Sequence, residues 1–592
     1  MRRHIWGAAA VLALFTGLLP AAPAQAGTSA ADGPGPLPLE RLFDNRAVSD
    51  DARPADADFD GAGGSLSARD LASAGWTPGR SLAVDGARLT WPRTAPGAPD
   101  NVRADGQAVR VRGRGNALAF LVAGTGGEAS GTGTVQYRDG SRRSYRLAAP
   151  DWRSGPLATK SVALPHINTP GGQLAERARL YVVTVPSARG REVATVRLPR
   201  DPGAPDLHVF AVSVRAETRG WTGTWSAPTA GYTAVGPWAD RSVRLVVHTS
   251  TGGPRVRVRL DNTFAATPVR IGGATVAVQE AGAGARGEPR RLSFRGASGT
   301  EIPAGAQAFS DPLDFDVPAD TNLLVSFHLP GPVATAPVHS QALQRSYVST
   351  PGDHTADGSP AAYTSTITTW PLLTGIDVGG GPGSVVLLGD SITDGVKSTP
   401  DANRRWPNIL ATRLLNQSAV PRYGVLGQGI SANRVVADRY PGDGVSTDTG
   451  GVSSLHRLDR DVLAQTSART IVVFQGINDV RWGASADQLT AGLREIAHRA
   501  HARGLRAVAA TIAPCEGESL CTAAANAQRE AANAYLRGSG DFDAVLDFDA
   551  VLRDPAHPAR LSPAYDSGDH LHPGDAGLAA LADSVDLRLL VP

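Results

Sequence analysis

The sequence predicts a multidomain protein in which two all-β, sandwich-like regions precede a C-terminal α/β domain with a parallel sheet. Across residues 38–377, short runs of β-forming residues, several alternating apolar and polar, are separated by clusters of Gly, Asp and Pro. That pattern is typical of β-sandwiches. After residues 379–383, continuous apolar runs alternate with helix-like stretches, which indicates a parallel sheet with helices on both faces. The length of 592 residues fits about three or four domains at roughly 150 residues each.

Residues 1–26 have the pattern of a cleaved export signal. Arg2 and Arg3 make the start positive, residues 5–19 form an apolar run, and an Ala-Gln-Ala sequence follows at the predicted cleavage position. The apolar run is shorter than the ~20 residues that a membrane-spanning helix needs, so we expect export with cleavage rather than a membrane anchor. Residues 27–37 are rich in Gly, Pro and Ala and predict a disordered leader. The mature protein is therefore expected outside the cell, with no membrane span.

Residues 38–218 form the first predicted β-sandwich. Its Phe59-Asp60-Gly61 and Asp151-Trp152 segments loosely resemble sandwich modules attached to secreted actinobacterial glycan-degrading enzymes. That resemblance makes the region a candidate carbohydrate-binding domain, but it carries over no specific binding residue. The predicted strands include residues 109–112, 117–122, 134–137, 179–184 and 207–214.

Residues 219–377 form the second predicted β-rich region. It opens with Trp221 and Trp225, which either stack on sugars or pack into the core; we favour the core. Strict alternation over residues 255–260 and apolar runs at 242–248 and 322–328 indicate strands.

Residues 378–592 form the predicted α/β domain. In a parallel sheet with helices on both faces, binding and catalytic groups lie at the carboxyl ends of the strands. The loops after Leu388, Leu426, Phe474 and Thr511 should therefore converge. The predicted strands are residues 384–388, 423–426, 470–474, 505–511 and 544–548, and the predicted helices are 405–416, 486–503, 522–537 and 575–589.

Four side chains at this end of the predicted sheet have the chemistry of acyl transfer. Ser391 follows the first strand, Asn478 follows the strand 470–474, and Asp569 and His572 precede the last helix. A serine nucleophile needs a base within hydrogen-bond reach, and a carboxylate holds that imidazole in the correct tautomer. An amide side chain can donate to the oxyanion that develops on the attacked carbonyl. We therefore predict Ser391, His572 and Asp569 as a catalytic triad.

The same blocks resemble the SGNH (GDSL-type) hydrolase family, over about residues 384–592. A Gly-Asp-Ser sequence ends at Ser391, a Gly-Ile-Asn-Asp sequence contains Asn478, an Asp-x-x-His sequence ends at His572, and a Trp-Pro pair opens the first helix. The resemblance implies a flavodoxin-like α/β/α sandwich with a five-stranded parallel sheet. It also implies hydrolysis of esters of carbohydrates, lipids and acyl thioesters without a metal or other cofactor. The second β-rich region is similar to the region that precedes the catalytic domain in a subset of secreted members.

One block departs from the family pattern. The family has a glycine after the second strand whose N–H donates to the oxyanion, and the matching position here is Ala432. An alanine keeps the N–H but disfavours a positive φ. The predicted oxyanion hole therefore consists of the Ser391 and Ala432 N–H groups with the Asn478 side chain, and the alternative to Ala432 is Gly429. Asp390 and Asp479 are expected to hold their loops by accepting backbone N–H bonds, and His570 to be structural or substrate-facing.

The two cysteines, Cys515 and Cys521, predict a disulfide that pins one loop in an oxidising compartment; the alternative is two free thiols. No metal site is predicted. The Asp56-Ala-Asp58-Phe-Asp60 segment begins like a calcium loop, but its twelfth position is Ser67 rather than Glu, so a plain acidic turn is favoured over calcium. With a net charge of +2 and no dense Lys/Arg block, nothing predicts a nucleic-acid partner.

Together these observations predict a secreted serine ester hydrolase that works through an acyl-enzyme. The preferred substrates are small acyl esters on polysaccharides, because two β-rich regions accompany the α/β domain, and lipid esters are the second choice. The alternative from another class is a glycan-binding protein with a catalytically silent α/β domain. We expect a monomer whose partner is its ester substrate.

Overall fold

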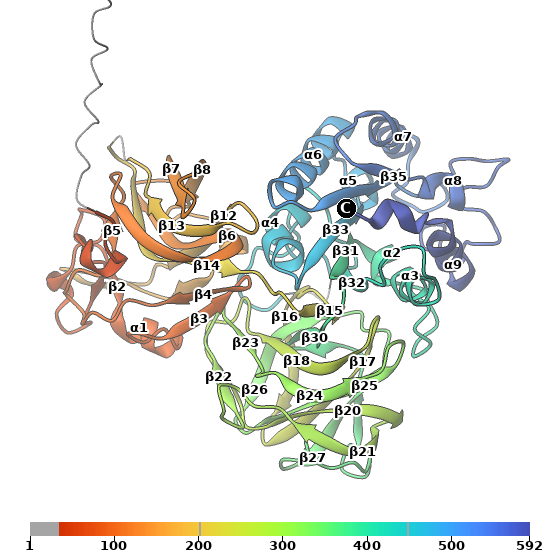
Figure 1. Ribbon diagram of the computed structural model, residues 1–592, viewed down its shortest axis with the longest axis horizontal. Helices are drawn as coiled ribbons and strands as arrows, with labels where there is room; N and C mark the ends of the chain where they lie inside the picture. The colour runs from red at the N-terminus through yellow and green to blue at the C-terminus, as the bar shows by residue number, and fades with distance from the viewer. Residues whose placement is uncertain (1–34, 201–202, 447–448) are drawn as a thin grey trace, which may run out of the picture.

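The computed structural model describes residues 35–200, 203–446 and 449–592 (Figure 1). The predicted signal peptide and most of the predicted leader lie outside the described residues. The described end of the leader joins the first β-rich region, where the Leu37 N–H donates to the Ala108 carbonyl at 3.1 Å. Within the described ranges, no helix combines the length and apolar character needed to cross a bilayer.

The first β-rich region contains an eight-stranded sheet and a smaller four-stranded sheet. The longest strand, β6 (Ala108–Thr125), joins two runs that the sequence predicted as separate strands, because residues 117–123 are fully buried and continue the same ladder. The large sheet has β5 (Val102–Arg103), β6, β7 (Ala129–Tyr137), β8 (Arg142–Ala149), β9 (Val162–Leu164), β12 (Ala178–Pro186), β13 (Glu192–Arg197) and β14 (Asp206–Ala216), and the small one has β1 (Val48–Ser49), β2 (Ser65–Ser67), β10 (Ile167–Thr169) and β11 (Gly172–Leu174).

The second β-rich region packs a seven-stranded sheet near a six-stranded one. In chain order, its strands are β15 (Trp221–Ser226), β16 (Gly231–Trp238), β17 (Arg241–His248), β18 (Gly253–Asp261), β19 (Val269–Ile271), β20 (Ala274–Ala281), β21 (Gly284–Arg291), β22 (Thr300–Ile302), β23 (Gln307–Phe309), β24 (Leu313–Val317), β25 (Asn322–Leu329), β26 (Val333–His339), β27 (Ser346–Pro351), β28 (Ser365–Ile367), β29 (Trp370–Pro371) and β30 (Leu373–Gly379). Trp225 is buried and packs edge-on against Trp370, as favoured for a core residue, whereas Trp221 is half-buried and lies beside Arg255 and Arg257.

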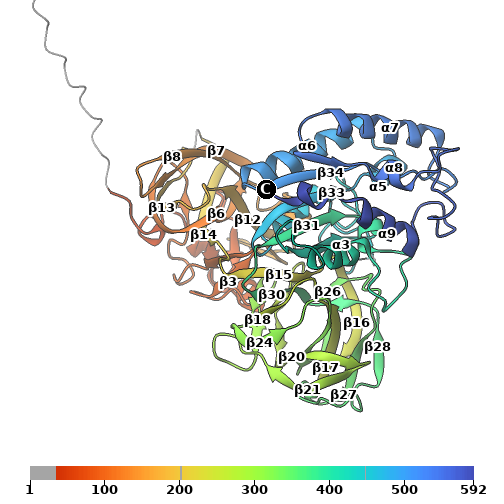
Figure 2. The ribbon, with the colours of Figure 1, turned by 45° about the vertical axis from the view of Figure 1, so that its right-hand side comes forward.

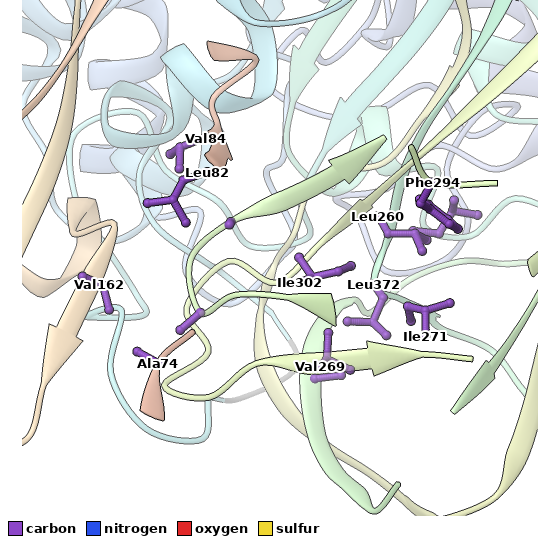
Figure 3. Packing of buried hydrophobic residues seen from close by; sticks show 14 of the residues in the cluster. Ala74, Leu82, Val84, Val162, Leu260, Val269, Ile271, Phe294, Ile302 and Leu372 are labelled. Atoms are coloured by element: carbon purple, nitrogen blue, oxygen red, sulfur yellow. The ribbon is translucent and has the colours of Figure 1, made fainter. Parts of the chain in front are cut away.

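A hairpin from the N-terminal region completes the seven-stranded sheet. Strands β3 (Ser81–Val84) and β4 (Ala87–Thr90) extend it beyond β23, through the pairing of Ala83 with Gln307. Leu82 and Val84 belong to the same hydrophobic core cluster as Ile302 of the second region, and Figure 3 draws these side chains within that cluster. The two β-rich regions therefore share apolar burial instead of being joined by a linker alone.

The C-terminal domain has the predicted fold, with five parallel strands in the order β32-β31-β33-β34-β35. Apolar residues alternate between its two faces: Val386 and Leu388 of β31 belong to one core and Val385 and Leu387 to the other. The strands are β31 (Ser384–Gly389), β32 (Gly424–Gly429), β33 (Ala468–Phe474), β34 (Arg506–Ala510) and β35 (Ala544–Leu546), and the helices are α2 (Ser391–Asp394), α3 (Trp406–Leu415), α4 (Ser454–Leu458), α5 (Ile477–Arg481), α6 (Ala486–Ala502), α7 (Ala523–Gly538), α8 (Phe548–Leu552) and α9 (Asp575–Ser584).

Two details differ from the sequence expectation or add to it. The last helix ends at Ser584, and the Asp586 side chain then accepts the Arg588 N–H to start a separate short turn. The second β-rich region also lies directly against the edge of the parallel sheet (Figure 2). There Gly424 of β32 approaches Gly223 of β15 so closely that a Cβ on Gly424 would lie 2.0 Å from the Gly223 carbonyl oxygen, so only glycine fits.

Candidate active site

Three of the four predicted loops, those after β31, β32 and β33, together with the turn before α9, bring their polar residues to the carboxyl end of the parallel sheet. Ser391 begins α2 immediately after β31, and Asn478 lies in α5 after β33. Asp569 and His572 lie in the turn before α9. The fourth loop, after β34, carries the predicted disulfide between Cys515 and Cys521, which is formed.

The predicted triad residues form a continuous hydrogen-bond chain. His572 Nε2 lies 2.8 Å from Ser391 Oγ, and His572 Nδ1 lies 2.8 Å from Asp569 Oδ2. The other Asp569 oxygen accepts the Leu571 and His572 N–H groups at 3.1 and 2.8 Å. The Asp-x-x-His spacing therefore works as a tight turn in which one carboxylate orients both the backbone and the imidazole.

The surroundings of this chain favour a neutral imidazole beside an ionised carboxylate. Burial lowers the pKa of His572 below its ordinary value, although the Asp569 carboxylate opposes the shift. Burial by itself would raise the pKa of Asp569, but hydrogen bonds from the His572 N–H, the His572 ring and the Leu571 N–H lower it to about 2. At neutral pH the arrangement can accept a proton from Ser391 and stabilise the resulting imidazolium.

The predicted oxyanion donors are two backbone N–H groups and one side-chain amide on the loops after β31, β32 and β33. Among the described residues, neither the Ser391 nor the Ala432 N–H has an acceptor. The Asn478 side chain is 2 % exposed; its Nδ2 donates to the Asn433 carbonyl at 3.0 Å, and its Oδ1 accepts from Arg481 at 3.0 Å. These two contacts fix which end of the amide carries the hydrogens, and the second Nδ2 hydrogen has no acceptor among the described residues.

Ala432 adopts a positive φ, the backbone conformation that an alanine disfavours. Its φ is +63°, a left-handed conformation that is strained for a residue with a Cβ. Gly429 ends β32, and a Cβ there would lie 2.3 Å from the Asp394 nitrogen. The glycine is therefore needed for close packing of β32 against α2, and Ala432 is the residue with the unpaired N–H.

A buried histidine from the second β-rich region, which the sequence did not predict as a site residue, supports this loop. His339, the last residue of β26, has Nε2 3.0 Å from Asp394 Oδ1 and Nδ1 3.0 Å from the Pro228 carbonyl. The second Asp394 oxygen accepts the Ser431 N–H and hydroxyl at 3.1 and 3.0 Å. Asp394 thus links α2, the residue before Ala432 and another domain, a connection that no local sequence signal marks.

The disulfide loop supports Asn478 through Arg481. Glu518, inside the loop, accepts from Arg481 Nε at 2.9 Å, and Arg481 Nη1 donates to Asn478 Oδ1. Glu518 is itself held by the Leu520 N–H at 2.9 Å. The signal available in the sequence was the pair of glutamates, Glu516 and Glu518, between the two cysteines.

The remaining predicted residues have mostly structural contacts. The Asp390 carboxylate accepts the Ile392 N–H, and Asp479 accepts the Val435 and Val436 N–H groups, which confirms their expected role in holding loops. Burial raises the pKa of Asp390 to about 7 and that of Asp479 to about 6. His570 lies 2.6 Å from Asp566 and is exposed.

The segment that begins like a calcium loop forms a turn held by its own backbone. Asp58 accepts the Gly63 N–H at 2.9 Å, and Asp60 accepts the Ala62 and Gly64 N–H groups at 3.0 and 2.9 Å. Across the described part of the chain, no three His, Cys, Asp or Glu residues are grouped so that they could hold a metal ion.

Comparisons with known protein families match the first and the last part of the chain. Residues 387–580 match the model of the GDSL-like lipase/acylhydrolase family, and residues 33–218 match that of the AziU2-like β-sandwich domain. Solved structures similar to this chain include a GDSL-like lipase from Bacteroides thetaiotaomicron, with 19% identity, 35% of this chain and 87% of that chain covered, and a TM-score of 0.27. Another is a catalytic mutant of an acetylxylan esterase from Geobacillus stearothermophilus, with 20% identity, 35% and 93% covered, and a TM-score of 0.27. No curated protein matches the chain.

Proposed function

We propose that this protein hydrolyses esters through Ser391, His572 and Asp569 and a covalent acyl-enzyme. It is a carboxylic ester hydrolase whose C-terminal domain belongs to the GDSL-like lipase/acylhydrolase family. The observation that carries the proposal is the unbroken chain of two 2.8 Å contacts from Ser391 Oγ through His572 to Asp569. These three groups come from one strand end and one distant turn, so their alignment is a product of the fold.

In the proposed reaction, Ser391 Oγ attacks the acyl carbonyl while its proton passes to His572 Nε2. The Ser391 and Ala432 N–H groups and Asn478 Nδ2 hold the oxyanion of the tetrahedral intermediate. The carbon–oxygen bond to the alcohol then breaks, and His572 returns the proton to that alcohol. A water molecule repeats the sequence on the acyl-enzyme and releases the carboxylic acid. Asp569 stays ionised throughout and stabilises the imidazolium.

We further propose that the protein is secreted and removes small acyl groups from polysaccharides. The export-signal pattern at residues 1–26 and the disulfide between Cys515 and Cys521 support an extracellular location. Attachment of the hydrolase domain to two β-rich regions supports a polymeric substrate, because such regions offer binding surface beyond the scissile bond.

The test is hydrolysis of p-nitrophenyl acetate, butyrate and longer esters by the purified protein and its Ser391→Ala variant. We expect turnover that falls with chain length and is lost in the variant while circular dichroism stays unchanged. Acetylated xylan, acetylated pectin and a phospholipid then compare substrate classes, and the acetylated polysaccharides should be preferred. Faster release of long acyl chains or phospholipid would replace the polysaccharide proposal. Polysaccharide binding without turnover of any ester would contradict the enzyme mechanism itself.

A further inference from the structure

A large, positively charged cavity lies where the three structured regions meet. Its volume is about 1140 Å³, above the ~300–1000 Å³ typical of pockets for drug-sized ligands. Eight arginines and only three acidic residues line it, and no lysine does. The excess of guanidinium groups makes it unlike an ordinary interdomain gap filled by matched ion pairs.

The alternation of side chains along strands explains how the chain forms the lining of this cavity. On β3, Leu82 and Val84 point into the hydrophobic core shared by the two β-rich regions (Figure 3), while Ser81 and Ala83 line the cavity. Successive side chains of a strand face opposite sides, so the strand that joins the regions also forms a cavity wall. On β18, Arg257 lines the cavity between two buried valines in the same way. The cavity therefore stands on a packed core and keeps its shape without a ligand.

Most of the lining arginines form no salt bridge with a carboxylate of the described residues. Arg80, Arg219 and Arg257 each contact a carboxylate. The other five lie within salt-bridge distance of no carboxylate anywhere in the described ranges; they are Arg88, Arg189, Arg215, Arg295 and Arg469.

Two of these unpaired groups are held at an energetic cost. Arg215 is 3 % exposed, and its two terminal nitrogens have no hydrogen-bond partner among the described residues. Buried polar atoms without partners are rare and point to an absent water, ion or ligand. Burial, together with the positive charges of Arg88 and Arg80, lowers the pKa of Arg295. An anion in the cavity beside Arg295 would offset the like charges of Arg88 and Arg80.

The cavity lies at the opposite end of the parallel sheet from Ser391. Residues 381–383 and 467–469, at the starts of β31 and β33, line it, whereas Ser391 follows the end of β31. A six-residue strand spans roughly 20 Å at ~3.3 Å per residue. A ligand in the cavity therefore does not occupy the acyl site, but one long chain can reach both.

We propose that this cavity is a binding site for an acidic oligosaccharide whose carboxylates pair with the unpaired arginines. Guanidinium groups match carboxylates in a bidentate manner. The positive groups form two close pairs, Arg88 with Arg295 and Arg189 with Arg469, so a ligand that pairs with both carries several anionic groups. The half-buried Trp221 and Phe309 also line the cavity, with the Arg257 guanidinium over both rings. Their remaining apolar surface suits sugar rings and would be left unused by a chain of simple phosphates.

The experiment measures binding to the full-length protein by isothermal titration calorimetry at low ionic strength. The probes are a short oligogalacturonate, a neutral xylo-oligosaccharide of equal length, and inorganic phosphate. The test variant is Arg88→Gln/Arg295→Gln. Its matched control is Arg286→Gln/Arg291→Gln, which removes the same charge from exposed positions on β21 outside the cavity. Hydrolysis of p-nitrophenyl acetate by both variants checks that the fold and the Ser391 site are intact.

We expect the oligogalacturonate to bind, the neutral oligosaccharide to bind at least tenfold more weakly, and the cavity variant to lose at least tenfold in affinity while the control loses less than twofold. Ser391→Ala should bind as the wild type does, so failure of the hydrolase proposal and failure of this one are distinguishable. Equal loss in both double variants would show attraction by net charge alone and overturn the site. Phosphate binding as tightly as the oligogalacturonate would overturn its assignment to a sugar polymer, and no binding of any anion would overturn the proposal entirely.

Discussion

The two ends of the parallel sheet contain different arrangements of charge. At the carboxyl end, Asp569, Asp394 and Arg481 each contact a partner within the chain at about 3 Å. At the amino end, five of the eight arginines that line the cavity form no salt bridge with a carboxylate in the described part of the chain. Internal pairing holds a reacting constellation in place before substrate arrives, whereas unpaired charge leaves binding energy available to a ligand. The difference suggests that one end is organised for chemistry and the other for holding a polymer.

The largest expected effect is loss of the proton acceptor at the carboxyl end. His572→Ala should lower kcat for p-nitrophenyl acetate by roughly 10⁴-fold or more, because Ser391 then has no base. Steady-state kinetics measures the loss. His570→Ala is the matched control two residues away, and it should keep most of the activity because His570 contacts Asp566 rather than Ser391. Equal losses in both variants would mean that the integrity of the turn, and not the His572 imidazole, determines activity.

A smaller effect is expected from the oxyanion amide. Asn478→Ala should reduce kcat about 10²- to 10³-fold with little change in KM, because the amide donates chiefly to the charge that develops in the transition state. A rise in KM at constant kcat would place Asn478 in substrate binding instead.

The pairing of Arg481 with Glu518 gives a test of internal positioning. Glu518→Gln removes the negative charge that holds Arg481 against Asn478. A charge-assisted hydrogen bond contributes ~1.5–3 kcal/mol, and the glutamine amide retains part of it. We therefore expect about a tenfold fall in kcat with KM unchanged. In the Asn478→Ala background the same change should have almost no effect. The control is Glu516→Gln in the same loop, whose carboxylate contacts the exposed Arg560. Full additivity of Glu518→Gln and Asn478→Ala would contradict the proposal that Glu518 acts on Asn478 through Arg481.

The pH profile of the reaction tests the pairing of His572 with Asp569. His572 must be neutral to accept the proton, and burial lowers its pKa below 6.5. Activity should therefore rise with pH through an apparent pKa below 6.5 and level off above it, while Asp569, with a pKa of about 2, stays ionised throughout. The dependence of kcat/KM on pH measures this limb. A limb centred above 7 would mean that a different group controls the reaction.

The smallest effect concerns the strained backbone beside the oxyanion site. Ala432→Gly should raise the free energy of unfolding of the C-terminal domain by about 0.5–1 kcal/mol, because a glycine accepts φ of +63° without the left-handed penalty, partly offset by its greater unfolded-state entropy. Chemical denaturation followed by circular dichroism gives the difference. Destabilisation would show that the alanine methyl packs usefully there.

Local patterns in the sequence predicted much of the C-terminal domain. The continuous apolar strands and the apolar face of α6 required no knowledge of distant contacts, since periodicity alone reports them. Because all parallel strands end at one edge, Ser391, Asn478 and His572 could be placed together before any distance was known. The β-rich regions were harder to divide. The β3–β4 hairpin lies early in the chain yet pairs with β23, and strand pairing between distant segments leaves no local mark.

The sequence by itself determined which residue types stand at the ends of the strands, that the last third of the chain alternates strand and helix, and that two cysteines are close enough to pair. Tertiary structure alone decided that His339 of one domain holds Asp394 of another, that Ala432 adopts a left-handed backbone, and that arginines from three regions surround one cavity. The physical reason is that periodicity and turn chemistry act over a few residues, whereas hydrogen bonds, burial and electrostatic crowding depend on which distant segments meet.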